Sequence, residues 1–189
     1  MMKILAAQYV LPVSSGPVTD SAVVIDESKI VEVGKQADIA AKFADIEIAD
    51  MGEAAILPGL VNCHSHLEIT ALRGALDHVE HDFRSWLLKL NELRSQFSLD
   101  DIGRAALMGA QEGARAGVTC FGDVGRNAHA GVNALKSVGL RGIVYQETEF
   151  SPDNRDADAS FIDLASKYEE LRSKETGLVQ VGLSPHSPY

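Results

Sequence analysis

The feature that most constrains the fold is an alternation of strand-like and helix-like segments that begins at residue 58. Short apolar runs are separated by longer segments in which apolar residues recur at helical spacing. Strands joined by helical crossovers lie parallel in one sheet, so this region is predicted to be an α/β structure. The expected strands are residues 60–66, 118–124, 140–147 and 178–184, and the expected helices are residues 83–97, 99–116, 127–138 and 159–174.

Two parallel-sheet folds fit this alternation, a doubly wound sheet and a (β/α)8 barrel. A doubly wound nucleotide-binding fold usually carries a glycine-rich phosphate loop after its first strand. Here the first expected strand runs into the sequence His-Ser-His-Leu-Glu at residues 64–68 instead. We therefore predict the N-terminal half of a (β/α)8 TIM barrel.

The first 57 residues have a different texture, with short apolar runs separated by turns. A Ser-Ser-Gly-Pro turn occupies residues 14–17, and Asp-Glu-Ser-Lys at residues 26–29 lies between two β-branched runs, which is typical of a hairpin. These strands are too few to close a β-sandwich by themselves. The predicted organisation is part of a small β-sandwich domain at residues 1–57, followed by the first four β/α units of the barrel at residues 58–189.

The composition is that of a soluble globular protein, with 46% hydrophobic and 23% charged residues. No apolar run approaches the roughly 18–20 residues that a membrane span needs. Residues 1–10 contain one lysine and a glutamine within their apolar stretch, so we interpret them as a strand rather than a secretory signal. Cys63 and Cys120 form no disulfide framework, and we expect a reducing, cytoplasmic location.

The net charge of −10 comes from 17 basic and 27 acidic residues. Such a surface repels phosphate groups, which argues against nucleic acid or an anionic membrane as the main partner. The charge does not identify a substrate.

The pair His64 and His66 carries the strongest chemical signal. Side chains alternate along a strand, so both imidazoles are expected on one side, and Cys63 and Ser65 on the other. At the carboxyl end of a barrel strand, active sites of this fold are found. Two neighbouring imidazoles there can share a metal ion, with nitrogens about 2 Å from it. Two ordinary histidines at a strand end are the alternative, but their position at the start of a β/α series favours a metal site.

The sequence Pro-Gly-Leu-Val-Asn-Cys-His-Ser-His at residues 58–66 resembles the opening metal motif of the amidohydrolase superfamily. In that superfamily, a β-sandwich made from both chain ends flanks a (β/α)8 barrel that holds one or two divalent metals. Further segments resemble the branch that contains the methylthioadenosine/S-adenosylhomocysteine deaminases, the aminodeoxyfutalosine deaminases and the chlorohydrolases. These segments are residues 67–74, 86–87, 117–123 and 184–189.

The resemblance implies that His64 and His66 are the first two ligands of a divalent metal, with zinc expected and iron or manganese as alternatives. It also implies that His186 contacts the substrate near the metal. The implied reaction is hydrolytic deamination of a nucleoside-like substrate by metal-activated water. A chlorohydrolase-type reaction on a triazine-like substrate is the alternative within the same fold.

Other residues are weaker candidates. Glu68 shares strand parity with the two histidines, so it is expected to face either the pocket mouth or solvent. Trp86 could line a nucleobase pocket or lie in the core. Glu147 and Glu149 are interpreted as solvated acids, with substrate contact as the alternative for Glu147, and Asp123 as a structural hydrogen-bonding residue. Three further histidines are expected at the surface: His78, His81 and His129.

One position departs from the branch. In the adenosylhomocysteine-type enzymes, an arginine near the end of the third barrel strand holds the substrate's carboxylate, and our alignment places Gln146 there. This counts against a substrate that bears an amino acid and favours an aminodeoxyfutalosine-like one. An offset of one residue would change that inference.

The rest of the family's catalytic set is expected outside this chain. In the family, a third histidine ligand and a proton-shuttling glutamate belong to the fifth strand, a further histidine to the sixth, and a metal-bound aspartate to the eighth. The chain ends at Tyr189, after the fourth expected strand. We therefore expect no catalytic residue within it, weak or absent metal binding, and no activity from these residues alone.

A half barrel leaves strand edges and an apolar sheet face uncovered. We expect the remaining half of the protein, or a second copy of the chain, to cover them. A catalytically inactive fragment or interaction module is the third functional interpretation.

Overall fold

The computed structural model describes residues 1–148 and 156–186, and it divides into two compact units, Met1–Pro58 and Gly59–Tyr189. Each unit is described by itself. Glu149, one of the weaker candidates, lies outside the described residues.

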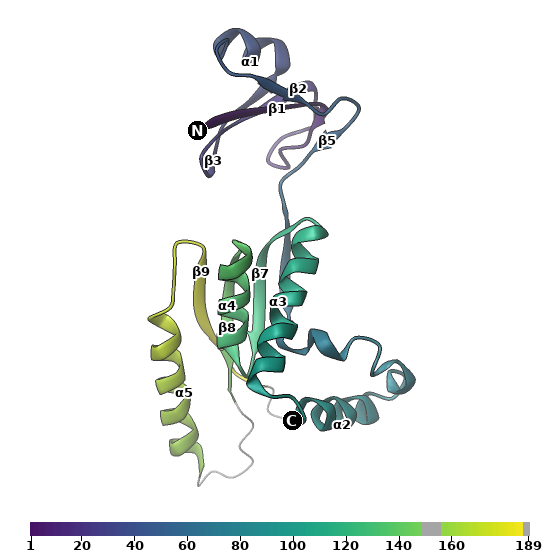
Figure 1. Cartoon of the computed structure of the whole chain (residues 1–189), viewed down its shortest axis with the longest axis vertical. Helices are drawn as coiled ribbons and strands as arrows, with labels where there is room; N and C mark the ends of the chain where they lie inside the picture. Colours follow the sequence, from purple (N-terminus) through teal and green to yellow (C-terminus); the bar gives the residue numbers. More distant parts are fainter. Residues whose placement is uncertain (149–155, 187–189) are drawn as a thin grey trace. The chain divides into compact units, whose positions relative to one another are not determined.

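The first unit is a β-sheet with one helix packed on it (Figure 1). The strand order is β3-β2-β1-β4, and β5 pairs with the far end of β1. The expected hairpin is present, with Asp26 opposite Lys29. The small core is formed by Ile4, Ala6, Ala22, Val24 and Ile39. The elements are β1 (Met2–Val10), β2 (Val18–Asp26), β3 (Lys29–Lys35), α1 (Gln36–Lys42), β4 (Ile48–Asp50) and β5 (Ala55–Ile56).

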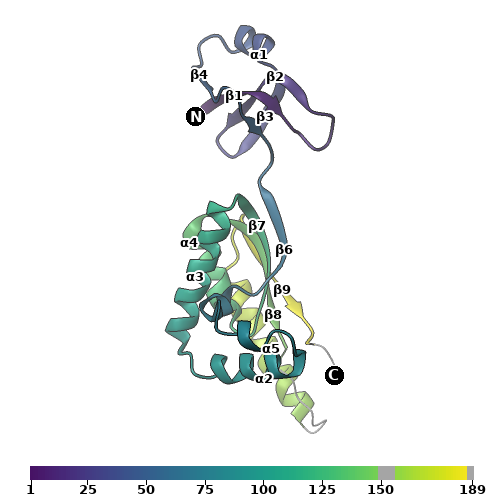
Figure 2. The ribbon, with the colours of Figure 1, turned by 90° about the vertical axis from the view of Figure 1, so that its right-hand side faces the viewer.

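The second unit contains a four-stranded sheet in the order β6-β7-β8-β9, with each neighbouring pair parallel. The strands are β6 (Leu60–Ser65), β7 (Val118–Gly125), β8 (Arg141–Glu147) and β9 (Val179–Ser184). Helices α3 (Leu99–Arg115), α4 (Ala128–Val138) and α5 (Ala157–Arg172) lie along one face of the sheet (Figure 2). This sequential parallel order with helical crossovers is the predicted first half of a (β/α)8 barrel.

The connection between β6 and α3 holds three further helical segments. They are the 3₁₀ helices η1 (Leu67–Leu72) and η2 (Asp77–Val79) and the α-helix α2 (Phe83–Arg94). The helix predicted over residues 83–97 therefore ends three residues early. The two 3₁₀ turns were not predicted, because segments this short carry no helical periodicity in the sequence.

Helix α3 packs closely against the sheet and against η1 through its glycines. A Cβ atom on Gly113 would lie 2.3 Å from the ring of Phe121, and one on Gly109 would lie 2.4 Å from the hydroxyl of Thr70. The helix begins with a capping box, in which Ser98 and Asp101 exchange backbone and side-chain hydrogen bonds.

The strand register assigns residues to the two faces of the sheet. Phe121, Val144 and Val181 face the helices and are buried. Val61 and Ile143 face the opposite way, where they are 61% and 38% exposed. The face without α3, α4 and α5 is called the open face below. None of the helices in the described part of the chain has the length and apolarity that a bilayer span requires.

Candidate active site

His64 and His66 project together from the carboxyl end of β6. Their ring centroids are 4.9 Å apart, the rings are nearly perpendicular, and both residues are exposed. The register between β6 and β7 shifts between Asn62 and Ser65, which is a bulge-like irregularity. After the shift, Ser65 pairs with Asp123 on the helix-covered side, so the flanking histidines lie on the open face. Cys63, expected on the side opposite the histidines, is exposed as well.

A carbonyl on the neighbouring strand orients the His66 ring. His66 Nδ1 lies 2.8 Å from the carbonyl oxygen of Val124. Because a carbonyl oxygen only accepts hydrogen bonds, Nδ1 must carry the hydrogen. In the neutral ring this leaves the Nε2 lone pair free to bind a metal, and such a bond to the second nitrogen is typical of metal-ligating histidines.

Asp123 holds the residues on both sides of His66, through the Leu67 amide and the Ser65 hydroxyl. Its carboxylate accepts hydrogen bonds from the Leu67 amide at 2.8 Å and from the Ser65 hydroxyl at 3.0 Å. Burial raises the pKa of Asp123 to about 6, and the two hydrogen bonds oppose that shift. A Cβ on Gly131 would lie 2.4 Å from its Oδ2, so α4 packs directly on this carboxylate. The structural role expected for Asp123 agrees with these contacts.

Glu68 occupies neither of its two expected places. Strand β6 ends at Ser65, and Glu68 lies in the 3₁₀ helix η1, so strand alternation no longer applies to it. Its side chain is 4% exposed and forms an ion pair with Arg94 of α2. It also accepts hydrogen bonds from the amides of Arg126 and Asn127. Glu68 therefore joins η1 and α2 to the loop between β7 and α4, and it belongs to the scaffold rather than to the surface of the site.

His186 contacts Glu147 at the end of the neighbouring strand, and Glu147 in turn lies next to Arg126. His186 Nδ1 lies 3.0 Å from Glu147 Oε1, and Arg126 Nε lies 3.6 Å from Glu147 Oε2. The amide of His186 donates to Thr148 Oγ1 at 2.6 Å. Glu147 is therefore paired, not the solvated acid that was expected. Both residues stand at the ends of adjacent parallel strands, and this adjacency was a signal in the sequence for their contact.

Gln146 faces the helices. It is 2% exposed, and its side-chain amide donates to the carbonyl oxygens of Arg126 and Glu147. Its neighbour Glu147 has the opposite parity and belongs to the open face. The residue at the end of β8 with open-face parity is thus Glu147, and Gln146 is buried on the helix side.

The remaining candidates lie apart from these contacts. Trp86 is half-buried on α2 and stacks on Phe83 with the ring centroids 6.1 Å apart. His78 and His81 are exposed, as expected. His129 is partly buried; Lys174, which follows α5, donates to its Nδ1, and Glu170 of α5 lies 3.6 Å from its Nε2.

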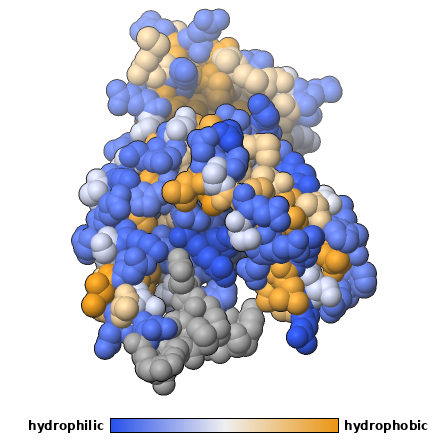
Figure 3. Space-filling view, turned by 60° about the horizontal axis from the view of Figure 1, so that its bottom comes forward, coloured by the Kyte–Doolittle hydropathy of each residue, from blue (hydrophilic) through white to orange (hydrophobic). Residues whose placement is uncertain are grey.

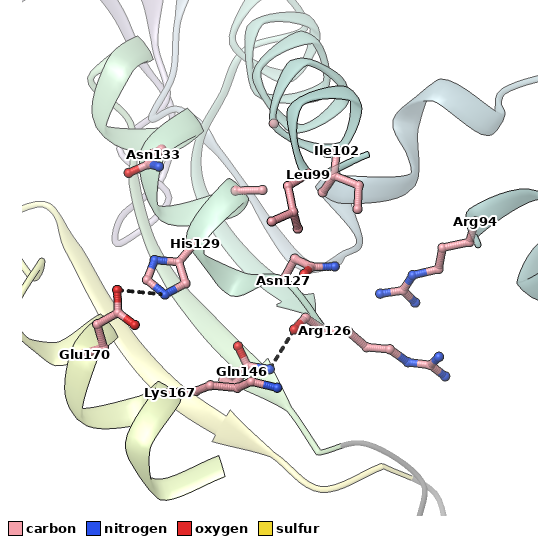
Figure 4. A pocket seen from close by; sticks show the side chains of 12 residues that line it. Arg94, Leu99, Ile102, Arg126, Asn127, His129, Asn133, Gln146, Lys167 and Glu170 are labelled. Carbon is pink, nitrogen blue, oxygen red and sulfur yellow. Dashed lines mark hydrogen bonds and ion pairs between the residues drawn. The ribbon is translucent and has the colours of Figure 1, made fainter. Parts of the chain in front are cut away.

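A cavity of about 670 Å³ lies on the helix side of the sheet, and neither His64 nor His186 lines it. Figure 4 shows Gln146 directed toward the backbone of Arg126 in this cavity, and His129 facing Glu170. The candidate site is instead on the open face. Figure 3, turned to bring the bottom of Figure 1 forward, shows mainly hydrophilic residues on that side of the second unit, with apolar residues scattered among them.

The two histidines can supply part of a metal site. Within residues 1–148 and 156–186, no group of three or more His, Cys, Asp or Glu residues is placed to hold a metal ion. A catalytic zinc typically has three protein ligands and an open position. The paired rings and the free Nε2 of His66 fit two of those ligands.

The chain resembles known proteins over most of its length. The amidohydrolase family profile matches residues 55–189. A 5-methylthioadenosine/S-adenosylhomocysteine deaminase of Bacillus cereus (strain G9842) is 31% identical over 172 residues, which cover 88% of this chain and 39% of the relative. The chain therefore spans about two fifths of the length of that relative.

Solved structures share the fold. The Helicobacter pylori aminofutalosine deaminase in complex with methylthio-coformycin has a TM-score of 0.78 at 24% identity, over 99% of this chain and 44% of that one. Atrazine chlorohydrolase of Arthrobacter aurescens TC1, complexed with zinc, has a TM-score of 0.77 at 21% identity, over 98% and 47% of the two chains. With the family profile matching more than half of the residues, the chain belongs to the amidohydrolase family.

Proposed function

We propose that this chain is the N-terminal part of a metal-dependent deaminase that acts on an adenosine-type nucleoside. The observation that carries the proposal is the pair of exposed imidazoles at the end of β6, with His66 Nε2 left free by the bond to Val124. The deaminase relative and the shared fold support the reaction class. These features favour a chemical role over that of an inactive module.

His64 and His66 would hold two positions around a divalent ion of the zinc class. When bound, such an ion lowers the pKa of water and polarises the group under attack. Val124 and Asp123 keep the His66 ring and its flanking backbone in place. The other ligands and the proton-transfer groups would come from residues beyond those described, so we expect residues 1–189 alone to bind metal weakly and to be inactive.

His186 is proposed to contact the substrate, because it stands at the same end of the sheet as the metal pair and its side chain is 29% exposed. Trp86 is proposed to line the nucleobase side, although its stack on Phe83 also suits a packing role. Glu147 faces the open side and offers no positive charge to a carboxylate. We therefore base the preference for an aminodeoxyfutalosine-like substrate on the missing positive charge at Glu147, instead of on Gln146. A substrate that bears an amino acid would need such a charge for its carboxylate.

The open face is proposed to be covered by the rest of the protein, with a second copy of this chain as the alternative. Val61 and Ile143 are exposed on that face, and buried parallel strands need cover on both faces. The partners proposed are therefore a small-molecule substrate and this covering segment, with no nucleic acid or membrane.

Hydrolysis of a triazine chloride is the second candidate, supported by the fold shared with the chlorohydrolase. The full-length gene product should be assayed for ammonia release from 5′-methylthioadenosine, adenosine and aminodeoxyfutalosine, and for chloride release from atrazine. Ammonia release that stops with a chelator and returns with zinc is the expected result. Chloride release alone would favour the second candidate, and no turnover with zinc present would favour the inactive module.

A further inference from the structure

The carboxyl ends of three neighbouring strands each contribute one charged or titratable side chain to a single row. Arg126 follows β7, Glu147 ends β8, and His186 follows β9. Glu147 lies between the other two, with Oε1 at 3.0 Å from His186 Nδ1 and Oε2 at 3.6 Å from Arg126 Nε. The Glu147 side chain is 14% exposed, so this carboxylate is largely enclosed by its partners.

We propose that Glu147 is a positioning residue, which holds the His186 ring with Nδ1 protonated and Nε2 directed to the substrate. A carboxylate only accepts hydrogen bonds, so the 3.0 Å contact requires a hydrogen on Nδ1. This leaves Nε2 as the ring nitrogen available to the ligand. The inference rests on the proposed function, because it assumes that His186 meets a substrate.

Two further contacts make this arrangement rigid. The His186 amide donates to Thr148 Oγ1 at 2.6 Å, which anchors the backbone after β9 to the residue that follows Glu147. On the other side, the positive charge of Arg126 balances the carboxylate. Among the described side chains, Arg126 Nε is a buried donor without a hydrogen-bond partner, so its interaction with Glu147 is one of charge rather than of a formed hydrogen bond.

Sequence order explains why Glu147, and not Gln146, belongs to this row. Ile143, Tyr145 and Glu147 alternate toward the open face, and Gln146 alternates toward the helices. Exchanging the roles of Gln146 and Glu147 would place a carboxylate beneath the helices and an amide beside His186. An amide can present either an acceptor or a donor to Nδ1, so it would not define the tautomer as a carboxylate does.

The first test reads the ring directly. In the full-length protein labelled with ¹⁵N-histidine, NMR shifts distinguish a ring protonated at Nδ1 from one protonated only at Nε2, and His186→Gln assigns the signal. We expect Nδ1 to be protonated in the wild type and the Nε2-protonated form to gain population in Glu147→Ala. A wild-type ring protonated only at Nε2, or an unchanged ring in Glu147→Ala, would overturn the proposal.

The second test uses turnover of 5′-methylthioadenosine. Loss of a group that orients a functional histidine typically costs about 10- to 100-fold, so Glu147→Ala should lower kcat/KM by that factor. In a His186→Ala background the same change should have no further effect, because nothing remains to be oriented. Additive losses would show that Glu147 acts on its own and would contradict the proposal.

Glu175→Ala is the matched control. Its carboxylate accepts from the Val181 amide, away from the carboxyl ends of the strands, so it should leave kcat/KM and the His186 signal unchanged. If Glu147→Ala does not fold, Glu147→Asp shortens the side chain by one methylene and should show the same changes in smaller degree. Absence of turnover in every protein would reject the proposed function, whereas the NMR result would still decide the role of Glu147.

Discussion

The two faces of the β6–β9 sheet carry polar residues with different roles. On the helix-covered side, Asp123 and Gln146 of the strands and Glu68 of η1 are buried, and each is hydrogen-bonded within the protein. On the open face, His64 and His66 are exposed, and the bond from His66 to Val124 leaves its Nε2 free. The comparison teaches that the polar residues beneath the helices hold the strand ends in place, whereas those opposite remain available to ligands.

The largest effect should follow from removing a histidine of the open face. His64→Ala or His66→Ala should lower deamination by the full-length protein at least about 1,000-fold, because several kcal/mol of transition-state stabilisation depend on the metal. Zinc content, measured by mass spectrometry of the purified protein, should fall in parallel. His78→Ala removes an exposed histidine elsewhere and should change neither quantity. Retained zinc and activity in the first two variants would contradict the assignment of the open face.

Glu68→Ala should give the largest loss of stability on the helix-covered side. It leaves Arg94 without its carboxylate partner and two amides without their acceptor, and breaking a buried ion pair costs about 3–5 kcal/mol. Urea unfolding of the full-length protein measures this loss. Glu112→Ala is matched to it, since Glu112 pairs with Arg73 at the exposed surface and should have a much smaller effect. Equal losses of unfolding free energy in the two variants would show that burial of the Glu68–Arg94 pair adds nothing to stability.

Asp123 should make stability depend on pH. The Asp123 carboxyl binds a proton more tightly in the folded state than in the unfolded state. Its contribution to the free energy of unfolding is therefore fully present below pH 3.8, and it is lost as the pH rises through about 6. That difference corresponds to about 3 kcal/mol. Asp123→Asn should therefore gain stability relative to the wild type as the pH rises from 4 to 7. Unfolding should be followed with a chelator present, because a bound cation would itself favour the ionised carboxylate. If the stabilities of the wild type and Asp123→Asn changed in parallel with pH, the account would be contradicted.

The smallest effect on catalysis is expected for Gln146→Met. The change removes two side-chain hydrogen bonds beneath the helices, so it should cost about 1–3 kcal/mol of stability and leave KM and kcat unchanged. Thermal unfolding and steady-state kinetics measure the two quantities. A raised KM with unchanged stability would indicate that Gln146, and not Glu147, lies on the face that meets the substrate.

Much of this architecture was predictable because it depends on local periodicity. The alternation after residue 58 predicted the parallel strand order, and the run 26–29 predicted the hairpin. The expectation that His64 and His66 project together also agrees with the structure. These features depend on residues that are neighbours in the sequence or along one strand.

The contacts that support the site were less accessible to sequence reasoning. Glu68 is 58 and 59 residues from the amides it binds, and His66 is 58 residues from Val124. No periodicity connects residues so far apart. The prediction that Glu68 would face the same side as the two histidines was wrong, because the strand ends at Ser65 and a 3₁₀ helix follows. For Gln146 and Glu147, a shift of one residue in sequence exchanges the two faces of the sheet, and the burial of Gln146 is set by helices distant in the sequence.

Anomalous X-ray scattering at the zinc edge, from crystals of the full-length protein, tests the central claim most directly. The account predicts a peak at about 2.0–2.1 Å from Nε2 of His66 and from a ring nitrogen of His64, on the open face of the sheet. A zinc peak held by other residues, with these two rings turned apart, would contradict it.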